Sequence, residues 1–127
     1  MDKVFGVEIT DGNDYYCLLD LPATDYELLD ALERLHMKPN DKPRWEIIEH
    51  TDFQYLHVHL INECDLYQLN ALANRLGQLD FCQKSAFEGL FNVEIYKKYG
   101  PISISTMIDL AYSTECCHVV EGVTTVS

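Results

Sequence analysis

The sequence predicts an α+β fold, with a small antiparallel sheet and one packed helix at the N-terminus followed by a C-terminal three-helix part. Alternating apolar and polar residues near the N-terminus are typical of strands with one buried face. From residue 65 onward, apolar residues recur at helical spacing instead. The 127 residues are enough for one domain, or for two halves that share a core. We therefore expect an acidic α/β subdomain over residues 1–62 and a helical subdomain over 63–127, or one compact unit containing both.

A β-hairpin is the first predicted element. Phe5, Val7 and Ile9 alternate with polar or small neighbours, and a turn-rich stretch follows at 11–14. Residues 15–21 are aromatic and apolar and end at a proline, which indicates the second strand of the hairpin.

The first helix is predicted to open at Thr24. The pattern Thr24-x-x-Glu27 is typical of a capping box, in which each side chain satisfies the backbone N–H of the other residue. Glu27, Asp30 and Glu33 lie away from the apolar stripe of this helix, so we expect them to face solvent. The stripe itself consists of Leu28, Leu29, Leu32 and Leu35.

A third strand and three further helices are expected after the turn-rich residues 40–43. Trp45, Ile47 and Ile48 indicate the strand, whereas residues 52–60 fit a strand and a short helix equally well. A leucine stripe from residue 65 predicts the first of the three helices.

The starts of the last two helices are marked by capping residues. Asp80-x-x-Gln83 is a second capping-box pattern, and Gly100-Pro101 marks where that helix ends. Ser103 or Ser105 is expected to cap the final helix.

Charge is the strongest functional signal in the chain. There are 21 acidic and 9 basic side chains, for a net charge of −12. No positive side chain occurs between Lys3 and Arg34. A field of one sign repels nucleic acid and anionic membranes but attracts basic grooves. We therefore expect neither direct binding of nucleic acid nor membrane association. The eight acids of this stretch are Glu8, Asp11, Asp14, Asp20, Asp25, Glu27, Asp30 and Glu33.

The sequence also indicates a cytoplasmic protein. The N-terminus has no apolar core of a signal peptide, and no apolar run approaches the roughly 18 residues that a membrane helix needs. The number of cysteines, five, is odd, which favours reduced thiols.

Three stretches carry a resemblance to a known family. They are Leu21 to Leu32, Cys64 to Ala73 and, after Pro101-Ile102, Ile108 to Val120. Their most specific blocks are Leu69-Asn70-Ala71-Leu72-Ala73 and Asp109-Leu110-Ala111-Tyr112-Ser113-Thr114-Glu115-Cys116-Cys117-His118. Together they resemble the ArdA-like antirestriction proteins that mobile elements of gut Firmicutes carry.

That resemblance implies an α/β part followed by a helical part, in an acidic inhibitor that occupies the DNA groove of a type I restriction enzyme. Surface carboxylates of such inhibitors stand in for phosphates, and family members are dimeric, so a homodimer is implied as well. Short acidic proteins from the same elements and from phages include anti-CRISPR proteins, whose RNA-guided targets also hold nucleic acid in a positive channel. The resemblance places the protein in the cytoplasm of a bacterial host.

We therefore predict an inhibitor without catalysis or cofactor, which binds a basic defence nuclease of the restriction or CRISPR type. DNA mimicry, an allosteric effect and competition with guide RNA remain open. Tyr16 and Tyr26 would be interface anchors if they are exposed beside the acids. The predicted binding residues, called the acidic surface below, are Asp11, Asp14, Asp20, Asp25, Glu27, Asp30 and Glu33.

Two other classes of function are weighed against this one. In the first, the helical half is an assembly module and the acids serve only solubility. In the second, the chain is a small thiol or metal enzyme that uses Cys116-Cys117-His118, with His57 and His59. The cysteine spacing does not fit a structural zinc site, and there is no nucleophile motif, phosphate loop or dinucleotide fingerprint. We accordingly expect no metal.

Overall fold

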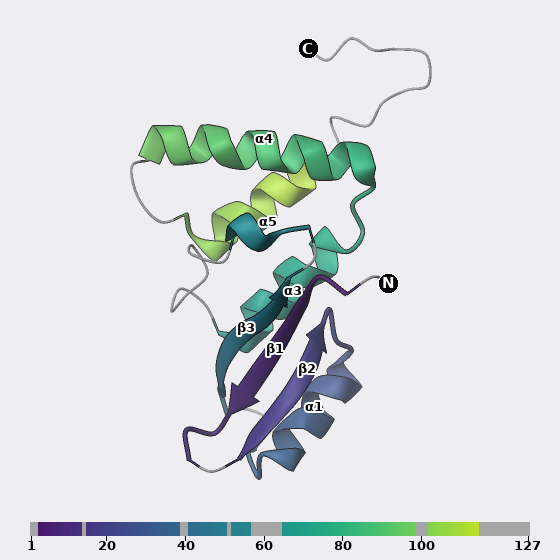
Figure 1. Cartoon of the computed structure of the whole chain (residues 1–127), viewed down its shortest axis with the longest axis vertical. Helices are drawn as coiled ribbons and strands as arrows, with labels where there is room; N and C mark the ends of the chain where they lie inside the picture. The colour runs from purple at the N-terminus through teal and green to yellow at the C-terminus, as the bar shows by residue number, and fades with distance from the viewer. Residues whose placement is uncertain are drawn as a thin grey trace.

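The computed structural model describes residues 3–13, 15–38, 41–50, 52–56, 65–98 and 102–114. A three-stranded antiparallel sheet and helix α1 form one end of the molecule, α4 and α5 form the other, and α3 lies between them (Figure 1). This arrangement confirms the predicted α+β fold. Within the described part of the chain, the elements are β1 (Phe5–Thr10), β2 (Tyr16–Leu21), α1 (Asp25–Arg34), β3 (Arg44–His50), the 3₁₀ helix η1 (Gln54–Leu56), α3 (Leu66–Leu76), α4 (Phe81–Lys98) and α5 (Ile104–Ser113).

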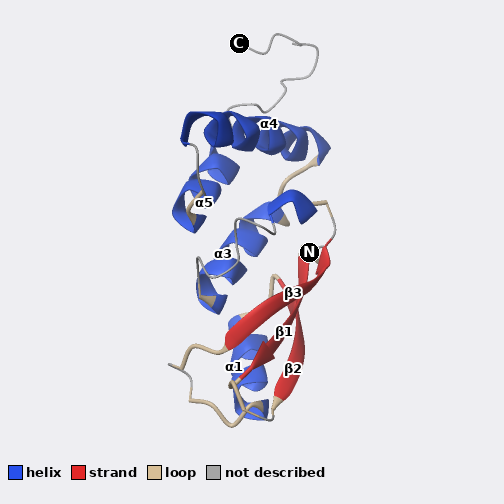
Figure 2. Ribbon diagram, turned by 60° about the vertical axis from the view of Figure 1, so that its left-hand side comes forward, coloured by secondary structure: helices blue, strands red, loops and turns tan. Residues whose placement is uncertain are grey.

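The sheet has the strand order β2-β1-β3, with β1 antiparallel to both neighbours. Phe5, Val7 and Ile9 are completely buried, as their alternation predicts. Figure 2 shows α1 and α3 on one side of the sheet and no described element on the other. The sheet therefore has one face in the core and one open face.

The pairing of β1 with β3 contains a β-bulge. Gly6 pairs with Glu49 and Val7 pairs with Ile47, so Ile48 has no partner on β1. Ile48 follows the buried Ile47 and is 48% exposed, and because of the extra residue Glu49 lies on the outward side as well. The hairpin partner β2, in contrast, pairs with β1 over six residues without a shift of register.

Helix α1 begins as the sequence predicts. The Thr24 side chain accepts a hydrogen bond from the Glu27 N–H, and the Glu27 side chain accepts one from the Thr24 N–H. Leu28 and Leu32 are buried, but Leu29 is 48% exposed, so its expected place in the core is wrong. At 100° per residue, Leu29 lies a quarter-turn from Leu28 and falls at the edge of the apolar face.

The three later helices also start at capping residues, of which Asp80 and Ser103 were predicted and Asp65 was not. Asp65 and Gln68 form a capping box before α3, and Asp80 and Gln83 exchange the same two bonds before α4. Ser103 caps α5 by accepting from the Thr106 N–H. Each of these motifs closes over four residues, and this is why the sequence alone could predict those at Asp80 and Ser103.

The hydrophobic core extends from the sheet into the helices. Residues 52–56, where strand and helix were both expected, contain η1, and Phe53 packs its ring 6.0 Å from that of Phe87 on α4. Residues 57–60 of that ambiguous segment lie outside the described residues. The division of the chain at residue 62 stays a prediction.

A hydrogen-bonded clamp joins α3 to the connection between β2 and α1. The Asn70 side chain accepts from the Ala23 N–H at 2.8 Å and donates to the Ala23 C=O at 3.0 Å. Two of the stretches that carry the family resemblance, around residues 21–32 and 64–73, are therefore in direct contact. The clamp fixes where the connection enters α1.

Among the described residues, no helix has both the length and the apolar character needed to cross a membrane.

Candidate protein-binding surface

The outer side of α1 carries four acids of the acidic surface. Asp25, Glu27, Asp30 and Glu33 are all exposed, which confirms that this side of the helix faces solvent. Asp25 and Glu27 lie in the first turn, where the helix macrodipole favours negative charge. A capped helix holds these carboxylates at defined positions relative to each other.

The four acids differ in how far they are already engaged. Glu27 serves the capping box, and Asp30 forms an ion pair with Arg34 at 3.1 Å. The described contacts give Asp25 and Glu33 no ion pair. Asp25 and Glu33 are thus the carboxylates of α1 that are most available to a partner.

The hairpin turn lies beside the C-terminal end of α1. The Tyr15 and His36 rings meet edge to face with 4.7 Å between their centroids. In the turn, the Asp11 carboxylate accepts from the Asn13 N–H at 2.8 Å, a local bond typical of such turns. The structure therefore brings Asp11 to the same end of the molecule as α1, while Asp14 lies outside the described residues.

More acids cluster on the open face of the sheet. Glu8 of β1 is paired with Glu46 of β3, and Lys3 lies between Asp20 of β2 and Glu49 of β3. A hydrogen bond to Glu49, assisted by the charge of Asp20, raises the pKa of the Lys3 ammonium above its ordinary value.

Sequence reasoning missed Glu46 and Glu49, which follow Arg34 in the chain. Only the pairing of β3 with β1 places them beside the N-terminal acids. Charge counting along the chain cannot reveal this neighbourhood, although an expected third strand next to β1 would have suggested it.

Exposed aromatic side chains accompany the acids. Tyr16 is 63% exposed and Tyr26 is 84% exposed, so both have the exposure that an interface anchor requires. Leu18 of β2, which the sequence did not single out, is 67% exposed between them in the chain. Its position on the outward side of β2 follows from the strand alternation.

A groove separates β2 from α1 and brings part of the acidic surface together. Its volume is about 660 Å³. Asp20 comes from the outer strand, where it also pairs with Lys3 at 3.6 Å, whereas Glu27 and Asp30 come from the helix. The residues that line this β2–α1 groove are Cys17, Leu18, Leu19, Asp20, Tyr26, Glu27, Asp30, Ala31 and Arg34.

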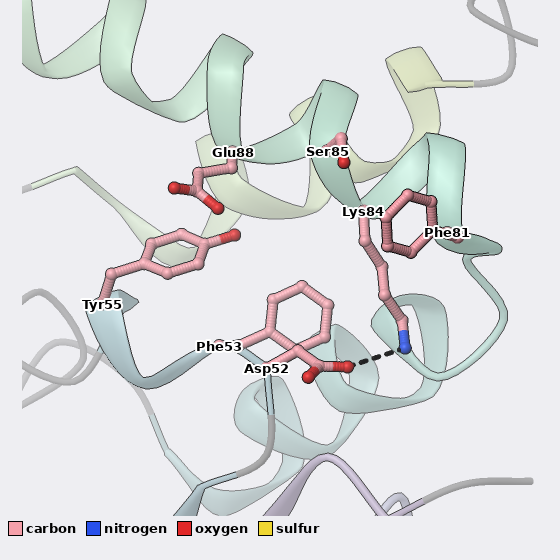
Figure 3. A pocket seen from close by; sticks show the side chains of 7 residues that line it. All are labelled: Asp52, Phe53, Tyr55, Phe81, Lys84, Ser85 and Glu88. Atoms are coloured by element: carbon pink, nitrogen blue, oxygen red, sulfur yellow. Dashed lines mark hydrogen bonds and ion pairs between the residues drawn. The ribbon is translucent and has the colours of Figure 1, made fainter.

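A second hollow lies at the other end of the molecule, between residues 52–55 and the first turns of α4 (Figure 3). It measures about 340 Å³. Lys84 and Asp52 form an ion pair at 2.9 Å on one side, and the Tyr55 hydroxyl and the Glu88 carboxylate lie on the other. The hollow also contains the exposed ring of Phe81.

The Tyr55 phenol is the group of this hollow whose pKa is shifted. Burial, followed by the charges of Glu88 and Asp52, raises the pKa of Tyr55, so this phenol stays protonated at neutral pH and can donate a hydrogen bond.

The residues of the thiol or metal hypothesis cannot be placed. Cys116, Cys117 and His118, like His57 and His59, lie outside the described residues. Within the described part, no three side chains of His, Cys, Asp or Glu are grouped as a metal site would require.

Comparison with known proteins adds no identification. No protein-family model, curated protein or solved structure matches this chain. The resemblance to ArdA-like antirestriction proteins therefore stays a prediction from the sequence strings.

Proposed function

We propose that this protein inhibits a defence nuclease of the restriction or CRISPR type by placing its acidic surface against the basic channel that holds nucleic acid. The observation that carries the proposal is the outer side of α1, where exposed carboxylates lie on a capped helix beside an exposed tyrosine. The protein would have no catalytic role of its own. Its contribution would be charge complementarity, which speeds encounter and favours basic partners.

The geometry of α1 is compatible with a phosphate-like array. Asp30 and Glu33 are three residues apart, which places their Cβ atoms about 5–6 Å from each other. Phosphates of one duplex strand follow at about 3.4 Å along the axis. Flexible carboxylate side chains bridge this difference, so helical spacing supports mimicry of a backbone without requiring it.

Reversal of two charges on α1 is the sharpest test. Asp25→Lys with Glu33→Lys changes the net charge from −12 to −8 but keeps the capping bonds of Glu27 and the ion pair of Asp30. The matched control is Glu88→Lys with Asp109→Lys, which gives the same net charge from exposed positions on α4 and α5. We expect the α1 variant to lose at least about tenfold in inhibitory potency, or about 1.4 kcal/mol of binding free energy.

The assay is cleavage of DNA by purified restriction and RNA-guided nucleases at about 0.01 M and about 0.15 M salt, where the Debye length is about 30 Å and about 8 Å. Inhibition should weaken as salt rises, and the control variant should inhibit like the unmodified protein. Unchanged inhibition by a folded α1 variant would contradict the proposal.

A second candidate function is supported by the helical end. Val93 and Tyr96 are three residues apart on α4 and are 50% and 86% exposed, so they form an apolar strip on one helix face. Such a strip favours self-association as an assembly module. Light scattering across a range of concentrations tests it, since Tyr96→Glu should shift an assembled form to monomers. Assembly without inhibition of any nuclease would favour this function over the first.

A further inference from the structure

The outer edge of β2 is open. In the strand order β2-β1-β3, β2 pairs with β1, and among the described residues no strand lies on its other side. Natural sheets usually protect such an edge with lysine, proline or a bulge. Strand β2 has none of these within Tyr16–Leu21, and the bulge of this sheet is on the β3 side. Apart from the charged side chain of Asp20, this regular edge of six residues has no such protection and can accept another strand.

The β2–α1 groove lies along this edge. Side chains of both elements line it, and its volume of about 660 Å³ can receive side chains of an added chain. In an extended peptide, alternate side chains point to the same side. A strand paired with β2 would thus place every second side chain toward the groove and the others toward the open face of the sheet. Recognition through a strand edge and side-chain pockets is a recurrent mode of peptide binding.

Exposed apolar side chains are concentrated at this edge and on the neighbouring helix. Five of the ten exposed large hydrophobic side chains of the described chain fall within residues 15–29, which is more than such a short segment would hold by chance. Clusters of this kind mark interaction surfaces, and tyrosines are frequent anchors in them. The five are Tyr15, Tyr16, Leu18, Tyr26 and Leu29.

The charge of the groove selects the occupant. Asp20, Glu27 and Asp30 line it with one base, Arg34, which is bonded to Asp30. Asp20 is paired with Lys3 at 3.6 Å, so three acids stand against two bases and the net charge of this region is negative. A second copy of this chain would bring the same acids, so like charges would oppose pairing between two copies. An extended segment rich in lysine or arginine fits both the edge and the charge.

We propose that the β2 edge and the β2–α1 groove bind an extended basic segment of a partner protein by addition of a strand to the sheet. The proposal rests on the proposed function in that the partner segment would belong to the basic nuclease. It goes further by requiring main-chain pairing with residues 16–21, which charge complementarity alone does not require.

Amide hydrogen exchange with a model peptide tests the pairing without any nuclease. The probe is an eight-residue peptide of alternating valine and lysine or arginine, and the comparison peptide carries glutamate in place of each basic residue. At about ten times its Kd, the basic peptide should slow exchange of the outward-facing β2 amides about tenfold by mass action. The glutamate peptide should leave that exchange unchanged.

Two exposed aromatic side chains provide matched variants. Tyr26→Ala removes a ring at the groove, whereas Phe81→Ala removes an equally exposed ring at the start of α4, both at 84% exposure. We expect Tyr26→Ala to weaken peptide binding by about tenfold, which corresponds to about 1.4 kcal/mol, and Phe81→Ala to have no effect.

The outcomes separate this inference from the proposed function. Absence of β2 protection by the basic peptide, or equal protection by the glutamate peptide, would overturn strand addition even if the protein inhibits a nuclease. Protection of β2 by the basic peptide supports strand addition even if no nuclease is inhibited. A nuclease complex that leaves β2 amides unprotected would likewise overturn it.

Discussion

The clamp between Asn70 and Ala23 makes a quantitative prediction about stability. Asn70→Ala removes two partly buried hydrogen bonds, at 2.8 Å and 3.0 Å, and leaves the N–H and C=O of Ala23 without these partners. Each such bond contributes about 1 kcal/mol net, and a polar group left unsatisfied adds to the loss. The expected loss from the contacts is therefore about 2–3 kcal/mol.

One effect opposes this loss. Alanine is a better helix former than asparagine by roughly 0.6 kcal/mol, and Asn70 lies inside α3. The net loss should then be about 2 kcal/mol. Asn74→Ala is the matched control, because Asn74 is exposed one turn further along the same helix. Asn74→Ala gains the same helix propensity but removes neither of the hydrogen bonds to Ala23.

Urea denaturation of both variants measures the difference. The midpoint for Asn70→Ala should fall while the slope with urea stays constant, since the same surface is exposed on unfolding. In a thermal scan, about 2 kcal/mol corresponds to a decrease of roughly 6–10 °C in Tm for a domain of this size. If Asn70→Ala is as stable as Asn74→Ala, the clamp does not hold the β2–α1 connection against α3, and the reasoning is refuted.

Two further predictions concern the first helix and the hollow by α4. Thr24→Ala should destabilise the fold by about 1 kcal/mol, measured by urea denaturation, because the Glu27 N–H loses its acceptor; a loss near zero would mean that water replaces the cap. Burial raises the pKa of Tyr55 above the ordinary tyrosine value of 10.0. The phenol therefore ionises first in the unfolded chain, so its contribution to the free energy of unfolding is full below pH 10.0 and is lost as the pH rises above it. Tyr55→Phe should reduce that alkaline fall in stability, and an identical pH profile for both proteins would contradict the assignment.

The starts of the helices could be predicted from the sequence because their causes are local. Asp80 and Gln83 satisfy each other's backbone N–H within one turn, whatever the rest of the chain does. The exposure of Leu29 was missed because a leucine at the border of the apolar stripe fits either environment. Only the packing of the helix on the sheet determines whether Leu29 is buried or exposed.

The acidic surface was predicted in part. The acids of α1 follow from helical periodicity, but the groove that joins Asp20 to Asp30 depends on how α1 returns along β2. The hollow by α4 depends on contacts such as Asp52 with Lys84, between segments 32 residues apart. No sequence pattern in either segment indicates that it contacts the other, so the sequence alone could not predict a site there.

The order of the strands has a consequence for how fast the chain folds. The helix caps close over four residues, but the ladder between β1 and β3 joins residues separated by 34 positions, as for Thr10 with Arg44, up to 45, as for Phe5 with His50. Contacts at long sequence separation require the chain to lose loop entropy before they contribute, which slows folding. If this ladder forms in the transition state, we expect changes in it to alter the rate of folding. If the helix caps close later, changes in the caps should alter mainly the rate of unfolding. Because β3 follows α1 in the chain but pairs with β1, the sheet is complete only after this long-range contact has formed.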